Sequence, residues 1–195
     1  MTNSSRSNGL VQFLLSLILS RGIENIRNDM DEREGRLMGR HSYCTQEMVN
    51  LVLLGAAISN LHDGNLDLGG EPPKILKGVR LQPLVGQLSL FEHYQNLKVG
   101  EYCKSPKYSI WVICSESHYS VAFCLQQIAP SPSMPFDLFY YDGLANQQQE
   151  IRLTLFPNQG TKKSNLRDLT SPIENCLKTK WPTAKLDWNG TEALL

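Results

Sequence analysis

The sequence IWVICSESHYSVAFCL at residues 110–125, together with FDLFYYDG at residues 136–143, decides the fold. Aromatic and β-branched residues dominate three runs, at 110–114, 119–125 and 136–141, and short polar or proline-containing segments separate these runs. Connections of about ten residues or fewer are too short for the crossover that parallel neighbours need. The three runs therefore predict an antiparallel meander.

The residues on either side of this meander complete the pattern of an α+β protein. Residues 151–156 predict a further strand, and residues 173–180 predict a helix after a polar loop. Towards the N-terminus, apolar residues at helical spacing predict one helix over 10–29, and Thr45 can cap a second helix that is apolar almost all round. We therefore expect helices followed by a mainly antiparallel sheet.

The remaining segments are predicted to form a surface loop, a short helix and a disordered N-terminus. Residues 61–78 contain Gly-Gly and Pro-Pro pairs without any periodicity, which predicts a surface loop. Residues 88–94 predict a short helix. Residues 1–9 are rich in Ser and Asn and are expected to be disordered, so that residues 10–195 form a single domain.

The composition excludes several classes of protein. The chain has 195 residues, and 19 basic and 19 acidic side chains give a net charge of +0, so no overall field attracts it to nucleic acid or to an anionic membrane. The apolar run at residues 10–19 is shorter than the roughly 18 residues that span a bilayer. It also lacks the cleavage pattern of a secretory signal, so we expect a buried helix and neither membrane nor nucleic-acid partners.

The cysteines favour a reducing compartment. They are odd in number and widely spaced, which argues against a disulfide framework and predicts a protein of the cytoplasm or the nucleus. No CxxC or HxxxH pattern and no phosphate-binding loop occurs, so we expect no metal and no cofactor. The five cysteines are Cys44, Cys103, Cys114, Cys124 and Cys176.

His118 is the candidate catalytic residue. It opens a predicted strand just after the polar triplet at residues 115–117, a position that holds a side chain on a rigid element and leaves it accessible. A histidine there can act as a general base that activates a thiol. The alternative is an ordinary surface or turn histidine.

Two further positions have both a catalytic and a structural interpretation. Cys44 precedes the helix capped at Thr45, where a thiol pKa is lowered, but we favour a buried structural cysteine. The motif from Asp142 to Asn146 lies downstream of His118, where papain-like enzymes keep the residue that orients the base. We favour a simple strand-ending turn there, since Asp-Gly is a turn pair, and leave the motif out of the candidate site.

Residues 110–121 resemble the MINDY family of deubiquitinases, cysteine peptidases that trim polyubiquitin of the proteasome-targeting lysine linkage. The likeness is strongest to the fourth-numbered branch of that family, which has an inactive B-type paralogue. It continues through other segments of the chain. These are residues 44–50, 55–60, 90–94, 99–100, 136–148, 151–154, 179–181 and 187–190.

The resemblance implies a fold, a partner and a role for His118. The fold would be the C-terminal half of a papain-like cysteine peptidase domain, the partner ubiquitin or polyubiquitin, and His118 the catalytic general base. The family's nucleophilic cysteine lies in a Gly-rich segment upstream of the part that Cys44 matches. We therefore expect a partial catalytic domain that is inactive as it stands.

Three functional hypotheses follow from this expectation. The first is a deubiquitinase represented by a shortened gene product. The second is a catalytically inactive relative that binds ubiquitin through an aromatic surface near Tyr119, Tyr140 and Tyr141. The third, which we favour least, is a small active peptidase that uses Cys44 as its nucleophile.

Overall fold

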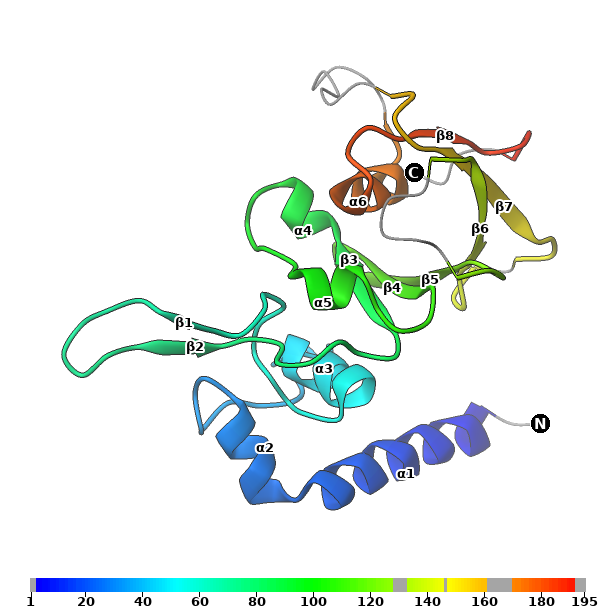
Figure 1. Cartoon of the computed structure of the whole chain (residues 1–195). Helices are drawn as coiled ribbons and strands as arrows, with labels where there is room; N and C mark the ends of the chain where they lie inside the picture. The colour runs from blue at the N-terminus through cyan, green and yellow to red at the C-terminus, as the bar shows by residue number, and fades with distance from the viewer. Residues whose placement is uncertain (1–2, 128–132, 146, 161–169, 192–195) are drawn as a thin grey trace. The chain divides into compact units, whose positions relative to one another are not determined.

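The chain forms two compact units that each combine helices with a β-sheet (Figure 1). The computed structural model describes residues 3–127, 133–145, 147–160 and 170–191. The N-terminal unit comprises residues 1–80 and the C-terminal unit residues 81–195. The α+β class predicted from the sequence is confirmed.

The C-terminal unit contains a six-stranded sheet in the order β3-β4-β5-β6-β7-β8. All neighbours from β4 to β8 pair antiparallel, which confirms the predicted meander. Figure 1 shows this sheet curving around helix α6 (Pro172–Lys180). The strands are β3 (Gly86–Ser89), β4 (Ile110–Ser115), β5 (His118–Phe123), β6 (Phe136–Tyr141), β7 (Ile151–Phe156) and β8 (Lys185–Asp187).

Strand β3 corrects the prediction of a helix over residues 88–94. Only α4 (Leu90–His93) is helical there, and the residues before it pair in parallel with β4. The connection back to β4 contains α4 and α5 (Glu101–Lys104) and is long enough for a parallel crossover. A Cβ atom at Gly86 would lie 2.1 Å from the carbonyl oxygen of Cys103, so only glycine fits at the start of this strand.

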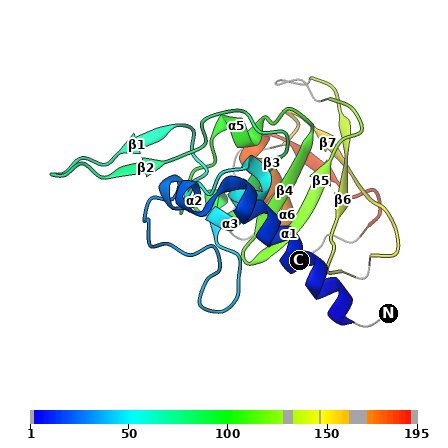
Figure 2. The same ribbon diagram turned by 90° about the horizontal axis from the view of Figure 1, so that it is seen from below.

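Alternate side chains of the sheet form the core of the C-terminal unit. In β4 and β5, Trp111, Ile113 and Ala122 are buried, as expected where every second residue faces inward. Helix α6 contacts β3 and β4 and adds Leu177 to this cluster, and Trp181 follows it with its ring 5.4 Å from that of Trp111. Figure 2 shows α6 lying against the same strands from a second direction.

The N-terminal unit begins with two helices where the sequence predicted one. Helices α1 (Asn3–Arg21) and α2 (Ile23–Asp29) meet at an angle of 82°. Gly22 between them has φ 84°, a conformation that L-residues rarely adopt. The Arg21 guanidinium spans the bend with two hydrogen bonds to the Asp29 carboxylate, one of 2.8 Å. The prediction of one continuous, buried helix is therefore wrong, because the helix breaks at Gly22 and Leu10, Phe13 and Leu19 are exposed.

The second helix of the prediction is confirmed as α3 (Gln46–Leu54). The Thr45 hydroxyl accepts a hydrogen bond from the Met48 N–H at 3.4 Å, and Gly55 ends the helix with φ 70°. The buried side of this helix joins a small hydrophobic cluster. That cluster consists of Ile26, Met30, Met48, Leu51 and Ala57.

The predicted surface loop at residues 61–78 contains a short hairpin. Strands β1 (Asn65–Asp67) and β2 (Ile75–Lys77) pair antiparallel. Each has only three residues and neither has a buried side chain. The sequence prediction missed them because three residues are too few to show the alternation of apolar and polar residues that predicts a strand.

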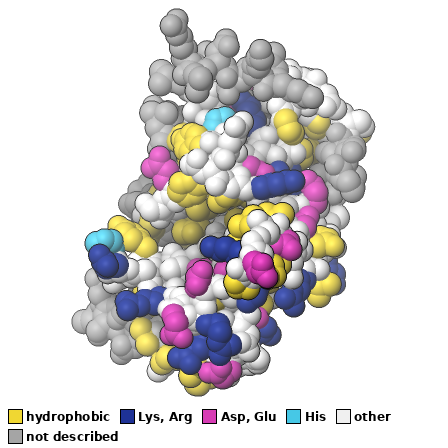
Figure 3. Space-filling model, turned by 90° about the vertical axis from the view of Figure 1, so that its left-hand side faces the viewer, with side chains coloured by type: hydrophobic (Ala, Val, Ile, Leu, Met, Phe, Trp, Pro, Cys, Tyr) yellow, Lys and Arg dark blue, Asp and Glu magenta, His cyan; other side chains and the backbone are white. Residues whose placement is uncertain are grey.

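On the face shown in Figure 3, Lys and Arg side chains are interspersed with Asp and Glu. Among the described helices, none is by itself long and apolar enough to cross a membrane. The bent pair of α1 and α2 meets these requirements only when its two helices are taken together.

Candidate active site

The hairpin between β4 and β5 places His118 at the first position of β5. Ser115 pairs with His118, and Glu116 and Ser117 form the turn between them. Glu116 has φ 57°, as the primed turns of tight hairpins require at their first central residue. The His118 side chain is 37% exposed, so the imidazole has a rigid backbone and remains accessible.

The His118 imidazole is bound by the carboxylate of Asp142, which directly follows β6. Nε2 of His118 lies 2.7 Å from Oδ2 of Asp142. The other carboxylate oxygen, Oδ1, accepts hydrogen bonds from the backbone N–H groups of Leu144 at 2.9 Å and Ala145 at 3.2 Å. The turn after β6 therefore fixes one oxygen of Asp142 and directs the other at His118.

The charge state of Asp142 determines which nitrogen of His118 carries the proton. Burial raises the pKa of the Asp142 carboxyl, but the hydrogen bonds from Leu144, His118 and Ala145 outweigh burial and hold that pKa below its ordinary value. An ionised carboxylate can only accept hydrogen bonds. At neutral pH, Nε2 therefore donates to Asp142, and Nδ1 is the nitrogen that can take up a proton.

The two interpretations of Asp142, a strand-ending turn and a partner of the base, are compatible in the structure. Asp142 both ends a strand in a turn and binds His118, so the turn interpretation did not exclude a role in the site. The strand register explains the contact. Val121 pairs with Tyr141, and because side chains alternate between faces, Asp142 lies on the same face of the sheet as His118. Asn146, the other polar residue of that motif, lies outside the described residues.

The cysteines of the C-terminal unit are unsuited to a nucleophilic role. Burial raises the pKa of the Cys124 thiol to about 12, with a smaller effect from Asp137, and raises that of Cys114. Burial followed by the neighbouring Cys114 raises the pKa of the Cys176 thiol to about 12. Cys103 is buried within α5. These thiols stay protonated or inaccessible at neutral pH.

Cys44 does not fit the buried role that we favoured. It is exposed in the N-terminal unit, just before the cap of α3. A free cysteine at a helix start is most often packed inside, and here its neighbours Tyr43 and Ser42 are exposed as well. The structural explanation of this cysteine is therefore wrong.

The aromatic surface suggested as a ubiquitin contact contains only part of the expected residues. Tyr140 is 3% exposed and belongs to the core, because it alternates with outward-facing neighbours along β6. Tyr141 is 55% exposed. On its side of the sheet, the rings of Phe123 and Phe139 stack at 5.6 Å. The outward aromatic face is thus built from odd-numbered positions of β5 and β6.

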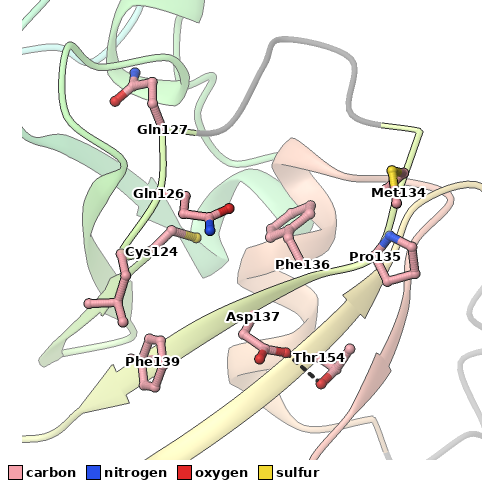
Figure 4. A pocket seen from close by; sticks show the side chains of 10 residues that line it. Cys124, Gln126, Gln127, Met134, Pro135, Phe136, Asp137, Phe139 and Thr154 are labelled. Atoms are coloured by element: carbon pink, nitrogen blue, oxygen red, sulfur yellow. Dashed lines mark hydrogen bonds between the residues drawn. The ribbon is translucent and has the colours of Figure 1, made fainter.

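A cavity of about 570 Å³ lies at the other end of β5 and β6, away from His118. Its walls include Phe136, Phe139 and the Asp137 carboxylate, which accepts a 2.8 Å hydrogen bond from the Thr154 hydroxyl (Figure 4). No group of His, Cys, Asp and Glu side chains among the described residues is arranged to hold a metal ion. The histidine–aspartate pair is therefore the better candidate for catalysis.

Fold and site together define an α+β protein with a histidine–carboxylate dyad, the arrangement that hydrolases use to orient a general base. The sequence profile of the conserved domain of the deubiquitinating enzymes MINDY-3/4 matches residues 2–190. The chain therefore belongs to the MINDY-3/4 family of deubiquitinating enzymes. No solved structure matches it.

Individual relatives agree with this assignment. The probable ubiquitin carboxyl-terminal hydrolase MINDY-4 of Xenopus tropicalis is 48% identical over 96% of this chain, and that of Homo sapiens is 45% identical over 96%. The ubiquitin carboxyl-terminal hydrolase MINDY-3 of Homo sapiens is 38% identical over 65% of the chain. These alignments cover 26%, 25% and 28% of the respective relatives, so the chain spans about a quarter of their length.

Proposed function

We propose that this chain carries the general base of a cysteine-peptidase site that cleaves polyubiquitin, and that His118 is this base. The observation that carries the proposal is the 2.7 Å bond between His118 Nε2 and Asp142 Oδ2. It assigns proton uptake to Nδ1, on an imidazole that a buried carboxylate orients. The printed names of the relatives, ubiquitin carboxyl-terminal hydrolases, support ubiquitin as the substrate class.

In the proposed reaction, Nδ1 of His118 removes the proton of a cysteine thiol, and the thiolate attacks the carbonyl carbon of the isopeptide bond. The imidazolium then gives this proton to the departing lysine amine. Water, activated by the same nitrogen, hydrolyses the acyl-enzyme and releases the thiol. We place the nucleophile in the family's Gly-rich segment, N-terminal to the matched region. The preference for the proteasome-targeting lysine linkage is part of the proposal and rests on the resemblance.

The experiment joins this chain to the segment that precedes the matched region in MINDY-4 of Xenopus tropicalis and measures kcat/KM on polyubiquitin. His118→Gln is expected to lower kcat/KM by about 10²–10⁴-fold, because it removes the general base. Cys44→Ala is the control and is expected to leave kcat/KM unchanged. Undiminished cleavage by the His118→Gln protein would contradict the proposal, and lost cleavage in Cys44→Ala would identify Cys44 as the nucleophile.

A second candidate function is ubiquitin binding without catalysis. It is favoured by the outward aromatic face, where Tyr141 is 55% exposed and the rings of Phe123 and Phe139 stack. The test mixes the 195-residue chain with ubiquitin that carries a C-terminal electrophile. Binding without covalent labelling supports this candidate. Labelling that disappears in Cys44→Ala would instead support a small peptidase built on Cys44.

A further inference from the structure

The side chain of Gln147 binds the backbone on both sides of the last residue of β6. Its Oε1 accepts a hydrogen bond from the Asp142 N–H at 3.0 Å. Its Nε2 donates to the carbonyl oxygen of Tyr140 at 3.1 Å and to that of Gln149 at 3.0 Å. One side-chain amide therefore connects the residue that binds His118 to the strand before it and the loop after it.

These bonds replace a missing neighbouring strand. The ladder between β6 and β7 ends at the pair of Tyr140 and Ile151, and the ladder between β5 and β6 ends at Tyr141. A residue of a parallel neighbour would donate to the carbonyl of residue 140 and accept from the N–H of residue 142. The amide of Gln147 makes the same two bonds. It thus satisfies the backbone of Asp142 one residue beyond the end of β6.

Asp142 has little freedom once its backbone is held. Its Oδ1 is fixed by the N–H groups of Leu144 and Ala145, so the position of the backbone determines where Oδ2 meets His118. We infer that Gln147 is a positioning residue, which keeps the Asp142 carboxylate on Nε2 and so fixes the tautomer of the neutral His118 ring in which Nδ1 is the proton acceptor. The use of this tautomer rests on the proposed function, whereas its geometry can be tested without catalysis.

The chemistry of the side chain explains why glutamine suits this position. The site needs an acceptor for one N–H and donors for two carbonyls within a single neutral group, which a primary amide provides. Methionine has a similar length but offers neither kind of hydrogen bond. Glutamate keeps the acceptor, loses the donors and places a charge beside the carbonyl of Tyr140 and the carboxylate of Asp142.

The test is ¹⁵N NMR of the neutral His118 ring, recorded at alkaline pH in the 195-residue chain. The wild type is expected to show one protonated nitrogen, Nε2, and one unprotonated nitrogen, Nδ1. In Gln147→Met the two ring resonances are expected to move towards each other, as the two tautomers interconvert. Gln148→Met, the same change at an exposed neighbour, is expected to keep the wild-type pattern. A dispersed amide spectrum shows that each variant is folded.

An unchanged pattern in folded Gln147→Met would overturn this inference and leave the proposed function untouched. If that variant does not fold, Gln147→Asn makes the comparison, because its amide is one methylene shorter and cannot reach the Asp142 N–H and the Tyr140 carbonyl together. A wild type without protonated Nε2 would overturn the inference and the proposed base geometry together. Conversely, if cleavage survives His118→Gln, and the wild type and Gln147→Met show the expected ring patterns, the proposed function falls and the role of Gln147 stands.

Discussion

The carboxylate of Asp142 couples the stability of the C-terminal unit to pH. Its hydrogen bonds hold its pKa below the ordinary value despite burial, so the carboxylate stabilises the fold above the unfolded pKa of about 3.9. That contribution is lost as the pH falls through the lower, folded pKa. Asp142→Asn is expected to reduce the free energy of unfolding at pH 7 by about 1–3 kcal/mol and to remove this part of the acid dependence.

Urea denaturation of wild type and Asp142→Asn across a series of pH values measures this effect. Glu150→Gln removes an exposed carboxylate from the same loop and serves as the control, with an expected pH profile like that of the wild type. Parallel pH profiles for wild type and Asp142→Asn would show that the Asp142 carboxylate carries no differential stability. The acid range is decisive because the two protonation states of Asp142 exchange there.

The sequence identifies His118 as a candidate and offers two interpretations of Asp142, but the contact between these residues and the role of Gln147 are seen only in the structure. A histidine after a polar turn at a strand start is visible in the local pattern. The strand register brings Asp142 to His118, which lies 24 residues earlier in the chain. The side chain of Gln147 binds the backbone of Asp142, 5 residues away. Local patterns do not contain such pairings, and the Asp-Gly turn offered a sufficient local explanation.

Gly22 determines that α1 and α2 form two helices. Its φ of 84° with ψ 135° is open to glycine, while an alanine Cβ there would meet only Asn25, at 3.5 Å. Gly22→Ala is therefore expected to destabilise the N-terminal unit by about 1–3 kcal/mol through backbone strain alone. Gly9 lies inside α1, and a Cβ atom there would have no neighbour within 4 Å. Gly9→Ala is therefore expected to stabilise the helix by about 0.5–1 kcal/mol.

Urea denaturation followed by circular dichroism measures the free energy of unfolding, which is expected to fall in Gly22→Ala and to rise in Gly9→Ala. Stabilisation by both would mean that α1 and α2 can straighten into the single helix that the apolar spacing predicts. The Arg21 to Asp29 ion pair opposes that outcome, because it requires the bend. A third variant, Arg21→Gln, is expected to weaken the bend without changing the backbone preference of Gly22.

The strands of the C-terminal sheet differ in how well the sequence predicts them. Strands β4 to β7 could be predicted because each has six residues rich in aromatic and β-branched side chains. Strand β3 could not, because it is buried at all four positions and shows no alternation. Its place beside β4 depends on the close approach of Gly86 to the backbone of Cys103. That contact exists only in the folded chain.

At the scale of the whole molecule, the two units have separate hydrophobic clusters of different size. Among the described residues, sixteen buried side chains form the cluster of the C-terminal unit and five form that of the N-terminal unit. Stability rises with the apolar area removed from water. The N-terminal unit is therefore expected to open at a lower free energy than the sheet of the C-terminal unit, which native-state hydrogen exchange measures.

Two leucine substitutions test whether this opening is local. Leu51 is 1% exposed in the N-terminal cluster and Leu153 is 0% exposed in the C-terminal one, so alanine at either position is expected to cost about 2–5 kcal/mol. Leu51→Ala should speed amide exchange in α3 and leave β4 to β7 protected, because the cavity affects only the smaller cluster. Leu153→Ala should speed exchange in the sheet. If either substitution lowered protection equally in both units, the chain would unfold as one cooperative body, and the base and its carboxylate would depend on the N-terminal unit for their stability.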